Sequence, residues 1–158
     1  MSAVLNQALA MRPMQMADLD AVMAIEPTIY SHPWTRGNFS DSLNSGYSAW
    51  VLLQQQQIIG YALMMMVLDE AHLLNISVAK AHQKQGLGRY LLNHMIEISR
   101  RHKAANMFLE VRTSNIAAIS LYENMGFCEM AIRRGYYPAD PAIFKSGRED
   151  AMLMGLAL

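Results

Sequence analysis

The sequence predicts a mixed α/β (α+β) domain in which a central sheet of about seven strands is flanked by about four helices. Apolar residues follow strand-like runs in some segments and helical spacing in others. One helical segment lies between two apolar strands, and such a strand–helix–strand unit implies parallel neighbours joined by a right-handed crossover. The length of 158 residues is near the usual size of one domain, so we expect residues 1–158 to form a single domain.

One short strand and two helices are predicted before the three-stranded meander. A short strand is expected over residues 8–14. Asp18 is a plausible N-cap for a helix whose apolar residues recur at helical spacing, and Pro27 should kink or end that helix. After the break His32-Pro33-Trp34, Thr35 is placed to cap a second, short helix.

The middle of the chain reads as a three-stranded meander. Strands are predicted over residues 48–53, 58–67 and 72–78, because each is an apolar run of strand length. The glutamine run 54–57 and the segment 68–70 are the turns between them. The longest apolar run, residues 58–68, is shorter than the roughly 20 residues that a membrane-spanning helix needs.

The C-terminal half combines two helices with three strands. An apolar stripe at spacings of four, four and three residues predicts the first helix, and Gly126 is well placed just after the end of the second. The predicted elements are a helix over 86–102, a strand over 107–111, a helix over 115–125, and strands over 128–134 and 151–158, the last two separated by a Pro/Gly-containing loop.

The composition is that of a globular chain. Hydrophobic residues make up 53% and charged residues 16%, which is too apolar for a disordered chain. The 13 basic and 13 acidic residues leave a formal net charge of +0, which argues against bulk electrostatic binding to nucleic acid or to an anionic membrane. The single cysteine, Cys128, excludes an intrachain disulfide and suits a reducing cytoplasm.

The first candidate for chemistry is the segment 82–89, between a predicted strand and a long helix. Gly86 and Gly88 let the backbone approach a ligand closely, and the first helical turn presents free N–H groups to an anion. Lys84 and Arg89 add positive charge. The segment is neither a Walker A loop nor a GxGxxG motif. It resembles a pyrophosphate cradle, and the alternative is an ordinary glycine-containing helix start.

The second candidate is Glu110, which stands among apolar residues of a predicted central strand. A carboxylate there is costly unless it is partnered or exposed in a cleft, and partial burial favours use as a base. The alternative is a strand-end glutamate paired with Arg112 or another cation.

Three further residues have simple structural interpretations. Tyr122 shares an apolar stripe and by itself reads as a core aromatic, and Asn115 reads as an N-cap. Cys128 is expected to be a buried structural thiol rather than a nucleophile, because no His–acid arrangement surrounds it.

Taken together, these segments resemble the GNAT acetyltransferase superfamily. The strand Asn75-Ile76-Ser77-Val78, followed by Gln83-x-x-Gly86-x-Gly88, is similar to that family's acetyl-CoA motif. Residues 109–127 contain Leu-Glu-Val-Arg, Ser-Asn, Leu-Tyr-Glu and Gly-Phe, and Arg-Arg-x-Tyr-Tyr-Pro and Gly-Arg-Glu-Asp follow. This set resembles the RimI-type branch, the ribosomal-protein-alanine N-acetyltransferases, over roughly residues 11–157.

The resemblance implies the GNAT fold, with the sheet splayed between strands 72–78 and 107–111, and it implies acetyl-CoA as co-substrate with no metal. Glu110 would be the general base and Tyr122 the general acid, with the Val78 N–H stabilising the oxyanion. Trp34 and the tyrosine pair 136–137 would line the peptide side. The coenzyme would be held by Ile76, Ser77, Val78, Lys84, Gln85, Gly86, Leu87, Gly88, Arg89 and Asn115.

The implied acceptor is the N-terminal alanine amine of a small-subunit ribosomal protein in the cytoplasm, with no direct binding to nucleic acid or membrane. Two features depart from the family: the loop 139–146 is longer than usual, and several extra residues precede the domain. One alternative keeps the fold and changes the acceptor to another protein N-terminus, a lysine or a small molecule. A second alternative is a non-catalytic acyl-CoA-binding module, which retention of both Glu110 and Tyr122 disfavours.

Overall fold

The computed structural model describes residues 9–158, and these form two compact units. The first, here called the N-terminal unit, comprises the described residues up to Met65 together with Asn75–Met95. The second, the C-terminal unit, comprises Met66–Leu74 and Ile96–Leu158. The extra residues noted at the start of the chain lie mostly outside the described residues. That residues 1–158 act as a single domain remains a prediction.

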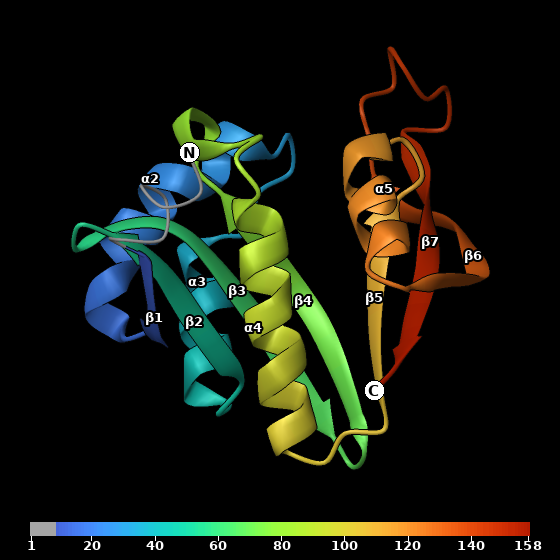
Figure 1. The fold of residues 1–158 in the computed structure, drawn as a ribbon. Helices are drawn as coiled ribbons and strands as arrows, with labels where there is room; N and C mark the ends of the chain where they lie inside the picture. The colour runs from blue at the N-terminus through green and yellow to red at the C-terminus, as the bar shows by residue number, and fades with distance from the viewer. Residues whose placement is uncertain (1–8) are drawn as a thin grey trace. The chain divides into compact units, whose positions relative to one another are not determined.

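The described residues form a seven-stranded sheet in the order β1-β2-β3-β4-β5-β7-β6 (Figure 1). The strands are β1 (Leu9–Pro13), β2 (Ser48–Gln54), β3 (Gln57–Val67), β4 (Glu70–Val78), β5 (Asn106–Arg112), β6 (Cys128–Pro138) and β7 (Arg148–Ala157). The helices are α2 (Leu19–Ile29), α3 (Arg36–Asn44), α4 (Leu87–Arg101) and α5 (Ile116–Asn124), with 3₁₀ turns η1 (Met16–Asp18) and η2 (Lys80–His82). The predicted element order and mixed sheet are confirmed. Within residues 9–158, every helix is too short or too polar to span a bilayer.

Helix α2 begins directly after Asp18, but its first turn is not capped by that side chain. Asp18 instead accepts a hydrogen bond from the Gln15 N–H at 2.7 Å and two from the Arg12 guanidinium at 2.8 Å each. The predicted capping contact was therefore wrong, because the carboxylate closes η1 and binds β1. Pro27 lies in the last turn of α2, which ends two residues later at Ile29.

Local side-chain chemistry accounts for the next two features. The Thr35 hydroxyl accepts from the Asn38 N–H at 3.1 Å, and the Asn38 side chain accepts from the Thr35 N–H at 2.9 Å, so the predicted cap of α3 is confirmed. Gln55 and Gln56 both have positive φ, 50° and 67°, and join β2 to β3 in a tight hairpin.

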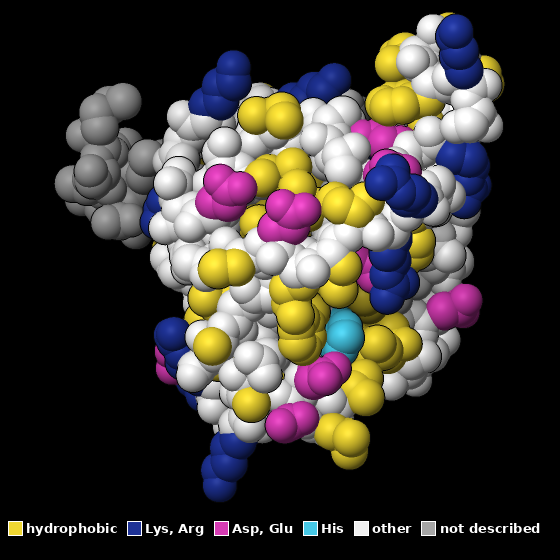
Figure 2. Space-filling model, turned by 90° about the vertical axis from the view of Figure 1, so that its right-hand side faces the viewer, with side chains coloured by type: hydrophobic (Ala, Val, Ile, Leu, Met, Phe, Trp, Pro, Cys, Tyr) yellow, Lys and Arg dark blue, Asp and Glu magenta, His cyan; other side chains and the backbone are white. Residues whose placement is uncertain are grey.

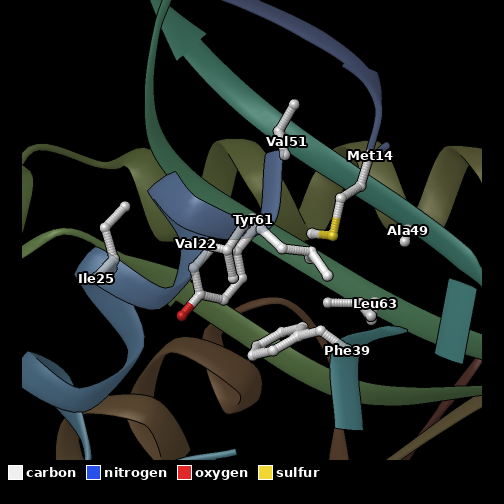
Figure 3. Packing of buried hydrophobic residues seen from close by; sticks show 9 residues of the cluster. Met14, Val22, Ile25, Phe39, Ala49, Val51, Tyr61 and Leu63 are labelled. Carbon is white, nitrogen blue, oxygen red and sulfur yellow. The ribbon is translucent and has the colours of Figure 1, made fainter. Parts of the chain in front are cut away.

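The N-terminal unit has its own hydrophobic core (Figure 3). Helices α2 and α3 bury apolar side chains against strands β2 and β3, and the Phe39 ring meets the Tyr61 ring edge-on with centroids 5.6 Å apart. The cluster consists of Met14, Leu19, Val22, Ile25, Phe39, Ala49, Val51, Tyr61 and Leu63.

The parallel ladder between β4 and β5 is short. It joins Glu70–Leu73 to Asn106–Leu109, whereas β4 continues to Val78 and β5 to Arg112. This agrees with the expectation that the two strands are parallel and that the sheet is splayed between them. In the sequence, α4 lies between these two strands. Its predicted apolar stripe is buried at Leu87, Leu91, Met95 and Ile98.

The C-terminal unit differs from prediction at its last strand pair. Asn115 caps α5, and Gly126 follows the helix with φ +100°, as expected. Strand β6 runs to Pro138, beyond the predicted end at residue 134, because it pairs with β7 as far as Arg148. Cys128 is exposed, so the expectation of a buried thiol was wrong. It opens an edge strand whose residues are mostly exposed.

The loop between β6 and β7 has an internal structure. Asp140 organises it, because its carboxylate accepts from the Ala142 N–H at 2.9 Å and its carbonyl accepts from the Phe144 N–H at 2.8 Å. Ile143 is 74% exposed. The loop forms the projection at the top of Figure 2, where hydrophobic and basic side chains lie on the surface.

Candidate active site

The predicted phosphate cradle lies in the N-terminal unit, at the start of α4. The backbone takes positive φ at Lys84, 63°, and at Gly86, 81°, so the chain turns sharply before the helix. The Tyr90 N–H donates to the Gly86 carbonyl at 3.1 Å, which marks the first turn of α4. The N–H groups of that turn have no acceptor within the helix, which is the arrangement that binds anions.

The space around Gly86 fits a bound phosphate group. A Cβ atom placed on Gly86 would meet no atom within 4 Å, so the space beside the backbone is open. Lys84 and Arg89 are exposed on either side of this glycine, and Leu87 is buried and anchors the helix. Open space beside the backbone and two cations suit the predicted pyrophosphate role, which remains a prediction.

We expect Gly86→Asp to reduce acetyl-CoA affinity by more than about 100-fold, because a carboxylate would enter an anion site. Gly46→Asp is the matched control: Gly46 has φ +77° and likewise has no atom within 4 Å of its Cβ position. Both variants carry the same backbone strain, about 1–2 kcal/mol. Isothermal titration calorimetry compares them, and equal affinities would remove the phosphate role from this loop.

The end of β4 presents backbone groups to the edge that faces away from β3. The Ala79 N–H donates to Ile59 of β3 at 2.8 Å. The Ile76 carbonyl instead accepts from the Tyr30 hydroxyl at 2.9 Å, and the Val78 carbonyl accepts from the Gln83 side chain at 2.9 Å. Alternate residues of a strand point to the same edge, so the N–H groups of residues 76 and 78 share this edge.

Two members of the predicted motif have side-chain contacts that the sequence did not reveal. Ser77 is buried, and its hydroxyl bonds Asn75 and Tyr30, so any coenzyme contact by Ser77 would come from its backbone. The Gln83 amide folds back onto the Val78 carbonyl, so this glutamine joins the loop to β4.

Glu110 lies on β5 in the C-terminal unit. Its side chain is 25% exposed, and Oε1 lies 3.6 Å from Nη1 of Arg133. Oε2 is buried and accepts no hydrogen bond among the described residues. A hydrogen-bonding interaction with Glu110 raises the pKa of Tyr136, so that hydroxyl stays protonated beside the carboxylate. Of the alternative, pairing with Arg112 or another cation, the second form is present: Arg133 is the cation near Glu110, and Arg112 pairs with Glu149.

Tyr122 lies on α5 and Asn115 is the N-cap of that helix, in the same unit. Tyr122 is buried, and its ring centroid is 5.7 Å from that of Phe127, so it does contribute to the core. The Asn115 side chain accepts from the Ala118 N–H at 3.3 Å, which confirms its reading as an N-cap. Neither contact tests the coenzyme or proton-transfer role, and both roles remain predictions.

A buried carboxylate near Glu110 was not singled out from the sequence. Glu149 accepts hydrogen bonds from the Ser114 N–H at 2.8 Å and from Arg112 at 3.2 Å. Arg112 also donates to the Pro138 carbonyl at 2.9 Å and lies 4.6 Å from the centre of the Tyr137 ring. Glu149 therefore joins the end of β5 to the strand pair β6–β7. The sequence did offer one signal for its burial: Glu149 is two positions from Ala151 on β7, so both side chains lie on the same, buried face of the strand.

Glu149 makes the stability of the fold depend on pH. Burial opposes ionisation, but hydrogen bonds from Ser114 and Arg112 outweigh it and lower the pKa of Glu149. A lowered folded-state pKa gives stability above the unfolded value, about 4.3, that is lost as pH falls through the folded value. We expect Glu149→Gln to lower the melting temperature at pH 7 and to differ less from wild type at pH 3.

Thermal unfolding from pH 7 to pH 3 measures this difference. The control is Glu129→Gln, since Glu129 is exposed on β6 and should give a constant, small effect. A gap between Glu149→Gln and wild type that stays constant over the whole range would contradict the linkage.

The seven-stranded mixed sheet and its helices are those of an acyltransferase fold, and comparison with known proteins agrees. The chain belongs to the acetyltransferase (GNAT) family, whose model matches residues 19–127. It is therefore an enzyme of the acetyltransferase class, as its sequence motifs indicate.

The similarity to ribosomal protein bS18-alanine N-acetyltransferase of Escherichia coli (strain K12) is 41% identity over 145 residues, covering 92% of this chain and 95% of that protein. The enzyme of the same name from Haemophilus influenzae is 36% identical over 141 residues, covering 89% of this chain and 93% of that protein. The crystal structure of the ribosomal-protein-S18-alanine N-acetyltransferase from Escherichia coli matches with a TM-score of 0.86 and 40% identity, over 94% of this chain and 93% of that chain.

Proposed function

We propose that this chain transfers acetyl from acetyl-CoA to the N-terminal alanine amine of a small-subunit ribosomal protein. The observation that carries this proposal is the 41% identity, over 92% of the chain, to an enzyme named for that reaction. Acceptors of another kind are not favoured by these relatives. The proposed setting is the cytoplasm, where ribosomal proteins are made, and the proposal needs no metal, membrane or nucleic acid.

The coenzyme is assigned to the N-terminal unit. The loop and first helical turn over residues 84–89 hold the pyrophosphate, through backbone N–H groups and the charges of Lys84 and Arg89. The edge of β4 supplies the N–H groups of Ile76 and Val78. The Val78 N–H is assigned to the thioester carbonyl oxygen, where negative charge develops during transfer. Asn115, a residue of the C-terminal unit, is assigned one further contact with the coenzyme.

Proton transfer is assigned to the C-terminal unit. An N-terminal ammonium has a pKa of about 7.7–8.0, so a carboxylate needs to remove its proton from only part of the population at neutral pH. The unpartnered Oε2 of Glu110 is the acceptor for that proton, directly or through water. The neutral amine then attacks the thioester, and the Tyr122 hydroxyl protonates the departing sulfur. Transfer is direct, because both substrates are bound together.

The test combines a cellular and a purified measurement. In cells that lack this chain, intact-mass analysis should show one small-subunit ribosomal protein lighter by one acetyl group. The purified chain should release CoA with a peptide that begins with that protein's N-terminal alanine, and not with the same peptide blocked at its amine. CoA release with free lysine or a polyamine instead, and no change in ribosomal masses, would overturn the proposed acceptor.

A further inference from the structure

A buried carboxylate in the N-terminal unit has no part in the proton transfers described above. Glu26 lies on α2, and only 1% of it is exposed. Its Oε1 accepts from the Tyr61 hydroxyl at 2.6 Å and from the Asn75 amide at 3.1 Å, and its Oε2 accepts from the Trp34 N–H at 2.9 Å. No ion pair of residues 9–158 includes Glu26. Three donors facing both oxygens are the arrangement of a carboxylate that hydrogen bonds alone keep buried.

The hydrogen bonds around Glu26 form a chain with one direction. Because the Asn75 nitrogen donates to Glu26, the Asn75 oxygen faces Ser77, whose hydroxyl donates to it at 2.7 Å. The only proton of Ser77 is then used, so Ser77 accepts from the Tyr30 hydroxyl at 2.8 Å. Tyr30 shares its proton with the Ile76 carbonyl at 2.9 Å. The donors of Asn75 and Ser77 therefore point toward Glu26, and the single Tyr30 proton lies between Ser77 and the Ile76 carbonyl.

The tyrosines at this site remain donors at neutral pH. Burial is the main cause that raises the pKa of Tyr30 to about 12. Burial, followed by the hydrogen bond to Glu26, raises the pKa of Tyr61 as well. The Tyr61 ring lies in the core beside Phe39 and Leu63, so its hydroxyl reaches Glu26 from a fixed position (Figure 3). The hydrogen-bonded chain is therefore fixed at Tyr61 by packing in the core and ends at the Glu26 carboxylate.

Glu26 connects two parts of the N-terminal unit that have different proposed tasks. Its Oε2 holds the backbone of Trp34, in the segment between α2 and α3 that is predicted to line the peptide side. Its Oε1, through Asn75 and Ser77, orients Tyr30 on the Ile76 carbonyl, at the coenzyme edge of β4. Tyr30 belongs to the same segment as Trp34, so the segment is attached at both of its ends.

We infer that Glu26 is a positioning residue for acetyl transfer: it holds residues 30–34 against the coenzyme edge of β4, and so sets where the acceptor amine is presented. The inference rests on the proposed function. Glu26 touches neither substrate in this assignment and transfers no proton. Glu26 affects catalysis by fixing the positions of Trp34 and Tyr30.

Glu26→Gln tests this role, because it keeps the size of the side chain and replaces one acceptor oxygen by a donor. The amide NH₂ must then face either the Trp34 N–H or the Asn75 NH₂. Both of these groups are donors, and donor-to-donor contacts are repulsive, whereas the Tyr61 hydroxyl can turn to accept. We expect the KM for the acceptor peptide to rise at least tenfold, while kcat at saturating peptide stays within threefold of wild type.

The matched control is Tyr61→Phe, which removes one donor to the same carboxylate and leaves the Trp34 and Asn75 contacts in place. Both variants lose a buried hydrogen bond, so both should lower the melting temperature. Only Glu26→Gln should raise the KM for the peptide. A second measurement does not depend on activity: in a Trp50→Phe background, Trp34 is the only tryptophan of the chain. Its fluorescence should shift to the red in Glu26→Gln and stay unchanged in Tyr61→Phe.

The outcomes separate this inference from the proposed function. If the wild-type chain does not acetylate an alanine-initiated peptide, the proposed function fails, and the fluorescence measurement still decides whether Glu26 holds Trp34. If wild type is active, and folded Glu26→Gln shows both an unchanged KM and an unchanged Trp34 spectrum, Glu26 has no positioning role. Equal rises in KM for Glu26→Gln and Tyr61→Phe would mean that Glu26 contributes only to general stability, and the positioning role would be contradicted.

Discussion

Glu110→Gln should slow acetyl transfer at pH 7 by about 10²–10⁴-fold, the range typical of a lost general base. The substitution keeps the shape of the side chain and removes its capacity to accept the proton at Oε2, the atom that is buried without a hydrogen-bond partner. Raising the pH should partly restore the rate. Below the amine pKa of about 7.7–8.0, each pH unit increases the neutral amine about tenfold, and above it the gain levels off.

A pH–rate profile with one alanine-initiated peptide measures this effect. Glu97→Gln serves as the control, because Glu97 is an exposed residue of α4 whose contact, 3.6 Å from Arg101, is on the surface. It should leave the profile unchanged. If Glu110→Gln keeps the wild-type acidic limb and loses less than about threefold in rate, the base is another group.

Tyr122→Phe should lower kcat by about 10²–10⁴-fold while acetyl-CoA still binds, because only the proton donor to the leaving sulfur is removed. The ring stays beside Phe127, so the packing of α5 on the sheet is kept. The reaction should become less sensitive to the variant when a thioester with a more acidic thiol is used, since a better leaving group needs less protonation. Steady-state kinetics with both thioesters measure this difference.

Tyr47→Phe is the control for Tyr122→Phe, since Tyr47 is half-buried in the turn before β2 and has no proposed role. Its kinetics should match those of wild type. A loss smaller than about threefold for Tyr122→Phe, at saturating substrates, would return Tyr122 to the function of a core aromatic.

Most of the secondary structure was predictable because its signals are local. The cap at Thr35, the glycine after α5 and the stripe of α4 each depend on residues within a few positions of one another, and the structure confirms all three. The predictions that were wrong depended on partners in other elements. Asp18 binds Arg12 rather than capping α2, and β6 is longer than predicted because β7 pairs with it.

The candidate site was predictable to a similar extent and for a similar reason. The strand, loop and glycines over residues 75–88 are contiguous, so the sharp turn with open space beside Gly86 follows from local backbone geometry, and its use as an anion site remains a prediction. The position of Glu110 within an apolar strand was equally visible. The partners of these residues were not: Arg112, the nearest cation in sequence to Glu110, pairs with Glu149 in the folded chain.

The order of elements, the class of the sheet and the family motifs were readable from the chain alone, because periodicity, caps and glycine positions act over short distances. Tertiary structure decided which buried carboxylates are satisfied and by what. Glu26 meets donors that are 35 and 49 positions away, in Tyr61 and Asn75, and Glu149 meets the Ser114 N–H 35 positions away. A buried carboxylate must find hydrogen-bond donors wherever the packing of the sheet brings them, and no local pattern records that packing.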